Sequence, residues 1–256
     1  MTGGDLTVGV FDSGMGGLTV LRELLRRPPA ARLLYLGDTA RLPYGTKSRA
    51  TVERYALKLG GFLAARGIDL LVVACNTASA VALDALAASL RVPVVGVVEP
   101  GARAAVRAGG RVGVLGTEAT ILSGAYTAAI TRLAPAAEVA AVACPLFVPL
   151  VEEGWTEGEV PRLVARRYLG ELGPVETLLL GCTHYPLLAP LLADEAPGAA
   201  VVDSATALAD EVRGRLGEFG GEPEVRFFVT DGAERFMTLG SRILGHPLGE
   251  VELIDV

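Results

Sequence analysis

Short runs of apolar residues alternate along this chain with segments in which apolar residues recur every third or fourth position. The run at 7–11 predicts a short buried strand, and the spacing of Leu18, Leu21 and Leu24 predicts an amphipathic helix after it. The same rhythm predicts strands at 32–36, 69–74 and 93–98 and helices at 52–62 and 78–90. Near-continuous apolar strands that alternate with helices indicate the α/β class, with a mainly parallel sheet flanked by helices.

The strand pattern repeats in the second half of the chain. VGVFD at 8–12 is similar to VGVLG at 112–116, and LVVACNT at 71–77 is similar to LLLGCTH at 178–184. The offsets of 104 and 107 residues nearly agree, which indicates an internal duplication. Chance similarity between apolar strands is the alternative. The duplication predicts two α/β lobes related by approximate two-fold symmetry.

The last part of the chain continues the same alternation. It predicts a helix at 207–216, a strand at 225–229 and a helix at 233–244. These elements complete one of the two sheets, and the pattern alone does not say which one.

Two cysteines occupy equivalent places in the repeat. Cys75 and Cys182 each follow a predicted strand directly and precede a predicted helix, whose first turn in the second case contains Pro186. Ligands of open parallel sheets bind at the carboxyl ends of the strands, and a helix N-terminus favours a thiolate. If the lobes face each other, one thiolate can remove a proton from a carbon while the opposing thiol donates one, which inverts that carbon.

Inert burial is the alternative reading of a cysteine, because free cysteines are among the most buried residues. We expect it to hold for Cys144. The polar residues that follow Cys75 and Cys182 argue against it at those two positions.

Asp12 and Ser13 end the first strand and therefore point to the same edge as Cys75. Asp12 can act on the thiol, hold a substrate ammonium group or cap the next helix. The glycines at 14, 16 and 17 do not complete a nucleotide-binding motif, because Thr19 stands where the third glycine would be needed. We expect this loop to present backbone amides to a carboxylate.

His184 lies two residues beyond Cys182 and is a candidate to assist proton transfer there. Two potential ligands are too few for a zinc site, so we expect no metal. His246 has no such neighbours and is interpreted as a surface residue. Of two adjacent acids, Glu152 is the candidate for the site and Glu153 the solvated neighbour, and the choice between them stays open.

Composition and net charge argue against several classes of protein. A net charge of −6 argues against nucleic-acid binding, no apolar stretch is long enough for a membrane span, and residues 1–5 carry no leader pattern. Three cysteines are too few and odd in number for a disulfide framework, so we expect a cytoplasmic protein. Lys47 falls in a loop and Lys58 on the polar face of a helix, which argues against pyridoxal phosphate as a cofactor.

Four motifs together resemble those of the cofactor-independent glutamate racemases of the aspartate/glutamate racemase family. They are VFDSGMGGL at 10–18, PYG at 43–45, ACNTA at 74–78 and LGCTHYP at 180–186. The resemblance implies an enzyme that interconverts L- and D-glutamate in a cleft between two lobes, needs no cofactor and supplies D-glutamate for peptidoglycan synthesis. It also implies a first lobe formed by 1–97 and 206–256, a second lobe at 98–205, and no room before Asp12 for a regulatory N-terminal extension.

The resemblance further assigns roles to residues. It makes Cys75 and Cys182 the two acid–base residues, with Asp12 assisting Cys75 and with Glu152 and His184 assisting Cys182. It implies substrate contacts at Asp12, Ser13, Tyr44, Gly45, Asn76, Thr77, Thr183 and His184. The match around Glu152 is looser than elsewhere.

Three other functions are kept as alternatives. A related racemase would act on aspartate or a hydantoin, a two-lobed binding protein would hold an amino acid without chemistry, and a cysteine hydrolase would use Cys182 with His184. Beyond a small-molecule substrate, we expect no nucleic-acid or membrane partner, and a homodimer stays open.

Overall fold

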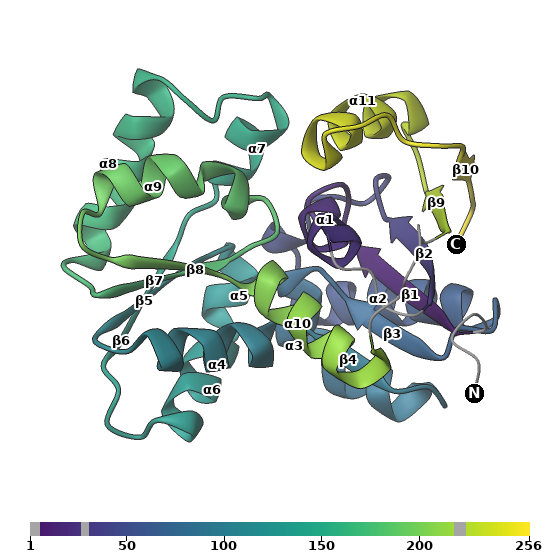
Figure 1. The fold of residues 1–256 in the computed structure, drawn as a ribbon, viewed down its shortest axis with the longest axis horizontal. Coiled ribbons are helices and arrows are strands. Elements are labelled where there is room, and N and C mark those ends of the chain that lie inside the picture. Colours follow the sequence, from purple (N-terminus) through teal and green to yellow (C-terminus); the bar gives the residue numbers. More distant parts are fainter. Residues whose placement is uncertain (1–5, 27–30, 218–223) are drawn as a thin grey trace.

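The computed structural model describes residues 6–26, 31–217 and 224–256, which form two parallel sheets, each flanked by helices (Figure 1). The segment 1–5, in which no leader pattern was expected, lies outside these residues. Among the described residues, no helix is both long and apolar enough to cross a bilayer.

The first sheet has the strand order β10-β9-β2-β1-β3-β4, and all of its pairings are parallel. Its strands are β1 (Thr7–Asp12), β2 (Arg32–Gly37), β3 (Leu70–Val73), β4 (Val94–Gly96), β9 (Val225–Val229) and β10 (Val251–Leu253). The predicted strand at 93–98 is shorter than expected because a helix already begins at Val98.

The second sheet has the order β6-β5-β7-β8, again wholly parallel. Its strands are β5 (Val112–Gly116), β6 (Val139–Ala143), β7 (Thr177–Gly181) and β8 (Ala200–Asp203). Replacing β1 to β4 by β5 to β8 turns the order β2-β1-β3-β4 into β6-β5-β7-β8. This agreement confirms the pseudo-symmetric two-lobed fold that the repeat predicted.

Helices cover both faces of each sheet. On the first sheet, α1 (Leu18–Arg26), α10 (Ser204–Leu216) and α11 (Ala233–Leu244) lie on one face, and α2 (Arg49–Ala64) and α3 (Asn76–Ser89) on the other. On the second sheet, α4 (Val98–Ala108) and α6 (Ala125–Leu133) lie on one face, and α7 (Phe147–Glu152), α8 (Glu159–Leu172) and α9 (Ala189–Glu195) on the other. Shorter elements are α5 (Glu118–Leu122) and the 3-10 turns η1 (Tyr44–Thr46) and η2 (Tyr185–Leu188).

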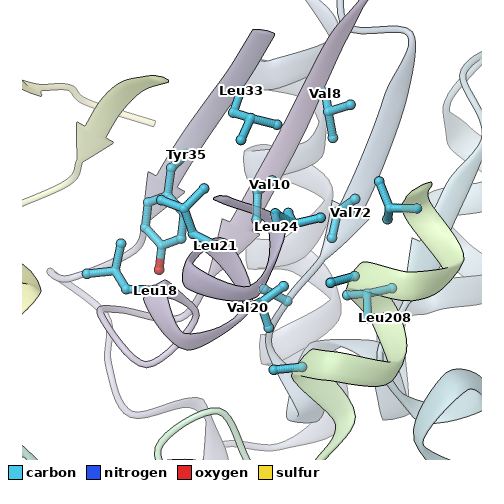
Figure 2. Close-up of a cluster of buried hydrophobic side chains, with 14 of the residues drawn as sticks. Val8, Val10, Leu18, Val20, Leu21, Leu24, Leu33, Tyr35, Val72 and Leu208 are labelled. Carbon is cyan, nitrogen blue, oxygen red and sulfur yellow. The ribbon is translucent and has the colours of Figure 1, made fainter. Parts of the chain in front are cut away.

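The core of the first lobe follows from the two-residue period of its strands. Val8 and Val10 point to the face that α1 and α10 cover, where they meet Leu24 and Leu208, as Figure 2 shows. Phe11 points to the opposite face, under α2 and α3. Because both faces are buried, the strand must be apolar at nearly every position.

The C-terminal segment returns to the first sheet. α10 begins directly after β8 of the second sheet but packs on the first-lobe core through Leu208 and Val212. β9 and β10 then extend the first sheet beyond β2. This answers the question that the hydrophobic pattern left open, while the exact lobe limits of 1–97, 98–205 and 206–256 stay a prediction.

The expectation that an α-helix follows Cys182 directly is wrong. η2 comes first, and α9 begins only at Ala189. Proline has no N–H, so Pro190 cannot donate to the carbonyl of Pro186 as a continuous helix would require. Pro190 instead occupies the first turn of α9, where the missing donor is harmless.

Candidate functional site

The first half of the site forms at the carboxyl ends of β1 and β3. Cys75 caps α3, and its sulfur accepts a hydrogen bond from the Ala78 N–H at 3.5 Å. The thiol in turn donates to Ser13 Oγ at 3.5 Å. Asp12, the last residue of β1, is fully buried and accepts the Gly14 N–H at 2.9 Å. Parallel neighbouring strands thus bring Asp12, Ser13 and Cys75 to one edge.

The second half forms after β7, the strand equivalent to β3. The sulfur of Cys182 lies 3.8 Å from His184 Nδ1, and His184 Nε2 lies 3.2 Å from Glu152 Oε1. Glu152 ends α7, which places its carboxylate beside η2. The three side chains therefore form a continuous chain of polar contacts that leads from the thiol to a carboxylate.

The two halves meet. Thr183 Oγ1 donates to Asp12 Oδ1 at 3.4 Å, across the two lobes. A negative charge on Cys182 raises the pKa of Cys75, and Asp12 raises the pKa of both Cys75 and His184. Both thiols are nearly closed to solvent, with exposed fractions of 4% for Cys75 and 5% for Cys182. The structure brings both cysteines to one closed junction between the lobes.

The surroundings of the two thiols differ in charge. Burial, followed by the neighbouring charge of Asp12, raises the pKa of Cys75 to about 12, so this group is a neutral thiol at pH 7. Burial also raises the pKa of Asp12 above its ordinary value. The first half of the site therefore disfavours additional negative charge.

His184 has the opposite character. Burial alone would lower its pKa, but hydrogen bonds with Cys182 and Glu152 outweigh burial and raise the pKa to about 10. Burial would likewise raise the pKa of Glu152, yet His184 and then Arg235 hold it below its usual value. At neutral pH the pair is an imidazolium facing a carboxylate, next to Cys182.

The remaining predicted substrate contacts lie along the same junction. Thr77 Oγ1 is 2.9 Å from Thr117 Oγ1 of the second lobe. A Cβ on Gly45 would lie 2.6 Å from the Cβ of Thr117, so only glycine fits there. Tyr44 is buried, and its hydroxyl donates to Asp38.

Asn76 crosses the junction as well. Its Nδ2 donates to Tyr126 Oη at 2.6 Å and to Ser204 Oγ at 3.0 Å. Its Oδ1 is buried and has no hydrogen-bond partner among the described residues. A buried acceptor without a partner is costly and marks a position where a ligand donor would fit.

Several residues of the junction were not predicted from the sequence: Asp38, Thr117, Tyr126, Ser204 and Arg235. Thr117 could have been predicted, because it follows β5 as Ser13 follows β1 in the repeat. Asp38 and Ser204 likewise directly follow β2 and β8, whereas Tyr126 and Arg235 contact the site from helices and no local pattern marks them.

Residues expected to lie outside the site do so. Cys144 is fully buried in the second-lobe core, where its thiol donates to the Val142 carbonyl at 3.5 Å. His246 and Lys58 are exposed. The side chain of Glu153 is 68% exposed and that of Glu152 is 12% exposed, which favours Glu152 as the site carboxylate. Among the described residues, no group of three or more His, Cys, Asp or Glu side chains has the arrangement of a metal site.

A cavity of about 250 Å³ lies next to the Glu152–His184 pair. It is lined by α7, η2, the loop before α1, and α11, including Met15, Leu187, Leu239 and Arg242. In Figure 1, α7 and α11 face each other across the top of the two lobes. The cavity thus approaches the second half of the site from the side where the lobes are joined by the ion pair of Arg235 with Glu152.

The structure thus has two thiols at equivalent places of two pseudo-symmetric α/β lobes, both at the junction of these lobes. The chain belongs to the Asp/Glu/Hydantoin racemase family, whose model matches residues 15–212. It is therefore an isomerase that acts on amino acids.

Individual relatives agree with this assignment. The chain is 53% identical to a protein named glutamate racemase from Geobacter metallireducens, over 97% of this chain and 96% of the relative. It is similar in structure to the glutamate racemase of Francisella tularensis in complex with D-glutamate, with a TM-score of 0.90, 35% identity and 98% of each chain covered. It is also similar to the Escherichia coli glutamate racemase in complex with L-glutamate, with a TM-score of 0.79, 31% identity, and 97% and 98% of the two chains covered.

Proposed function

We propose that this chain interconverts L-glutamate and D-glutamate by proton transfer at the α-carbon, with Cys75 and Cys182 as the two acid–base residues. One observation carries the proposal: two buried, electrostatically coupled thiols follow equivalent strands of two sheets with the same strand order. Glutamate is supported as the substrate by the name of the Geobacter relative and by the ligands of the two similar structures.

In each turnover one sulfur is a thiolate and the other a thiol. The thiolate takes the α-proton, and the electron pair of the broken C–H bond stays on the α-carbon. The opposing thiol then donates its proton to that pair from the other face and becomes the thiolate. The product has the opposite configuration, and the two sulfurs have exchanged protonation states, so the reverse reaction can begin from the other enantiomer.

The polar neighbours have different proposed roles. The imidazolium of His184, held by Glu152, offsets negative charge on the sulfur of Cys182. Asp12 contacts Thr183 of the second lobe and is coupled to Cys75, so it is suited to assist proton transfer at Cys75 or to hold the substrate ammonium. The free Oδ1 of Asn76 supports a contact with the same ammonium group.

The other predicted substrate contacts, Ser13, Tyr44, Gly45, Thr77 and Thr183, line the same junction and are proposed to orient the two carboxylates. Acid–base groups alone contribute roughly 10²–10⁴-fold to a rate. Because an α-proton is far less acidic than a thiol, the closed junction must supply further stabilisation of the developing charge.

The biological setting is part of the proposal. We infer a cytoplasmic enzyme that works without a cofactor and supplies D-glutamate for peptidoglycan synthesis, and we leave a homodimer open. The discontinuous first lobe, 1–97 with 206–256, would move against the second lobe, 98–205, to admit the substrate.

The test is exchange in heavy water without any added cofactor. Either glutamate enantiomer should lose optical purity and gain deuterium at the α-carbon, as followed by chiral chromatography and mass spectrometry. A protein that only binds amino acids would incorporate no deuterium. Faster exchange of aspartate or of a hydantoin than of glutamate would instead identify a related racemase, and an acyl-enzyme at Cys182 would identify a hydrolase.

A further inference from the structure

Thr19 joins the two lobes at the site, although its position in α1 belongs to none of the expected catalytic motifs. The side chain is fully buried. Its hydroxyl lies 2.9 Å from the carbonyl oxygen of Gly16 and 2.9 Å from the carbonyl oxygen of Thr183. A hydroxyl has one hydrogen, so the donor is shared between a carbonyl of its own loop and a carbonyl of the opposite lobe.

Gly16, which also accepts from the Thr19 hydroxyl, packs so closely against the opposite lobe that no side chain fits at this position. A Cβ built on Gly16 would lie 2.4 Å from Thr183 Oγ1 and 2.5 Å from the ring of His184. The glycine loop of the first lobe therefore touches the segment after Cys182 directly. Thr19 holds the two segments at this separation from within α1.

Thr183, whose carbonyl accepts the hydrogen bond from Thr19, is connected to both halves of the site. It lies between Cys182 and His184 in the chain, so fixing its carbonyl fixes the backbone that carries both side chains. Its own hydroxyl donates to Asp12 Oδ1 at 3.4 Å. A displacement at Thr183 would thus alter the spacing between the Asp12 half and the Cys182 half together.

We propose that Thr19 is a positioning residue for the reaction: its hydroxyl fixes the separation of the two half-sites at which both sulfurs reach the same α-carbon. The inference rests on the proposed two-thiol function. It also explains why threonine stands where a nucleotide-binding loop would have glycine, because glycine lacks the hydroxyl that spans the lobes.

The test compares three variants of the full chain. Thr19→Val keeps the shape of the side chain but removes the donor, and Thr19→Ser retains the donor. Thr177→Val is the matched control: Thr177 is also fully buried and donates to a backbone carbonyl, that of Gly109 at 2.6 Å, but this contact lies within the second lobe. Each variant is measured for unfolding by urea, for kcat and KM, and for deuterium exchange.

We expect Thr19→Val to lower kcat by roughly 10- to 100-fold, because a displacement of about 1 Å at reacting groups has an effect of that size. KM should change little, and Thr19→Ser should restore most of the activity. Thr177→Val should lose comparable stability but keep its kcat. In heavy water, the rate at which Thr19→Val incorporates deuterium at the α-carbon should fall together with kcat, because the first thiol returns the proton that it removed and deuterium enters from the second thiol.

The proposal is overturned if Thr19→Val keeps the wild-type kcat, or if its loss of kcat only parallels its loss of stability as in Thr177→Val. Should Thr19→Val fail to fold, Gly16→Ala tests the same contact from the opposite side, and an unchanged kcat in that variant overturns the proposal. These outcomes are distinct from failure of the proposed function, in which the wild-type chain itself would not racemise glutamate.

Discussion

Cys75 and Cys182 are equivalent in the fold but not in their surroundings. Cys75 lies beside Ser13 and the buried carboxyl group of Asp12, whereas Cys182 lies beside the imidazolium of His184. The substrate is chiral, so a site that handles both enantiomers has no need for identical neighbours on its two faces. The proposed mechanism requires only that each face has a group that can exist as thiol and as thiolate.

The first prediction at this scale concerns the thiols. Cys75→Ser and Cys182→Ser should each lower kcat by roughly 10²–10⁴-fold. A serine hydroxyl is a much weaker acid than a thiol, and it does not ionise near neutral pH to act as the base. Urea unfolding should show that both variants stay folded. Cys144→Ala is the control and should keep most of the activity, since Cys144 lies in the core of the second lobe. Near-normal turnover in either serine variant would rule out the two-thiol mechanism.

A second prediction concerns pH and His184. The folded protein keeps a proton on this imidazole up to about pH 10, whereas the unfolded chain loses it near 6.5. The stabilisation is therefore complete below pH 6.5 and is lost as the pH rises toward 10, by up to about 1.4 kcal/mol per pH unit.

Urea unfolding between about pH 7 and pH 8.5 isolates this group, because Cys75 ionises in the unfolded chain only near 9.0 and adds a loss in the same direction at higher pH. The variant His184→Asn should lack the slope in this window. An equal slope in wild type and variant would show that the proton is not held at His184.

At the scale of elements, strands and helices with strong patterns could be predicted from the sequence. The strand at 225–229 and the helix at 233–244 agree with β9 and α11, because both have a clear apolar face. The stretch between β5 and β7 yielded no predicted elements. It contains β6, whose sequence VAAVA is apolar throughout but half-exposed at a sheet edge and rich in alanine, a residue that is depleted in strands.

The candidate site divides in the same way. Asp12, Ser13, Cys75 and Thr183 could be found because each follows a strand, and parallel strands share one edge. Tyr126 and Arg235 could not, because both lie within helices and their part in the site depends on which elements the fold brings together. The order of strands and the return of the chain at α10 decide those contacts.

α7 offers a prediction that separates two adjacent acids. The helix ends with Glu152 turned toward His184, while the exposed side chain of Glu153 lies 3.6 Å from Arg235. Glu152→Gln should lower kcat by roughly 10- to 100-fold, since a buried hydrogen bond to a charged group is worth about 1.5–3 kcal/mol. Glu153→Gln is its control and should remain close to wild type. Equal effects of the two substitutions would mean that Glu152 does not act through His184.

At the scale of the whole molecule, the lobes are joined on several sides of the site. Thr77 contacts Thr117, Thr183 contacts Asp12, and Arg235 of α11 lies 3.7 Å from Glu152 of α7. Both thiols are nearly closed to solvent while these contacts hold. We therefore expect the substrate to enter when the lobes separate, and binding should favour the closed arrangement.

This predicts a pattern of thiol alkylation. Iodoacetamide should reach Cys75 and Cys182 through separation of the lobes, and Cys144 only through unfolding within the second lobe. Glutamate at ten times its Kd should slow labelling of the first two by roughly tenfold, as ligand binding to one state requires. Peptide mass spectrometry gives the rate at each cysteine. Equal protection of all three would indicate that the ligand stabilises the whole fold and not the closed state.

The path of the chain has a consequence for biosynthesis. All strands of the second sheet come from the continuous stretch 112–203, whereas the first sheet begins with β1 and ends with β10, close to the C-terminus. A ribosome releases residues in order, and domains fold as they emerge. The second sheet, which begins later in the chain, can thus be completed first. The edge of β2 stays unpaired until β9 has left the exit tunnel.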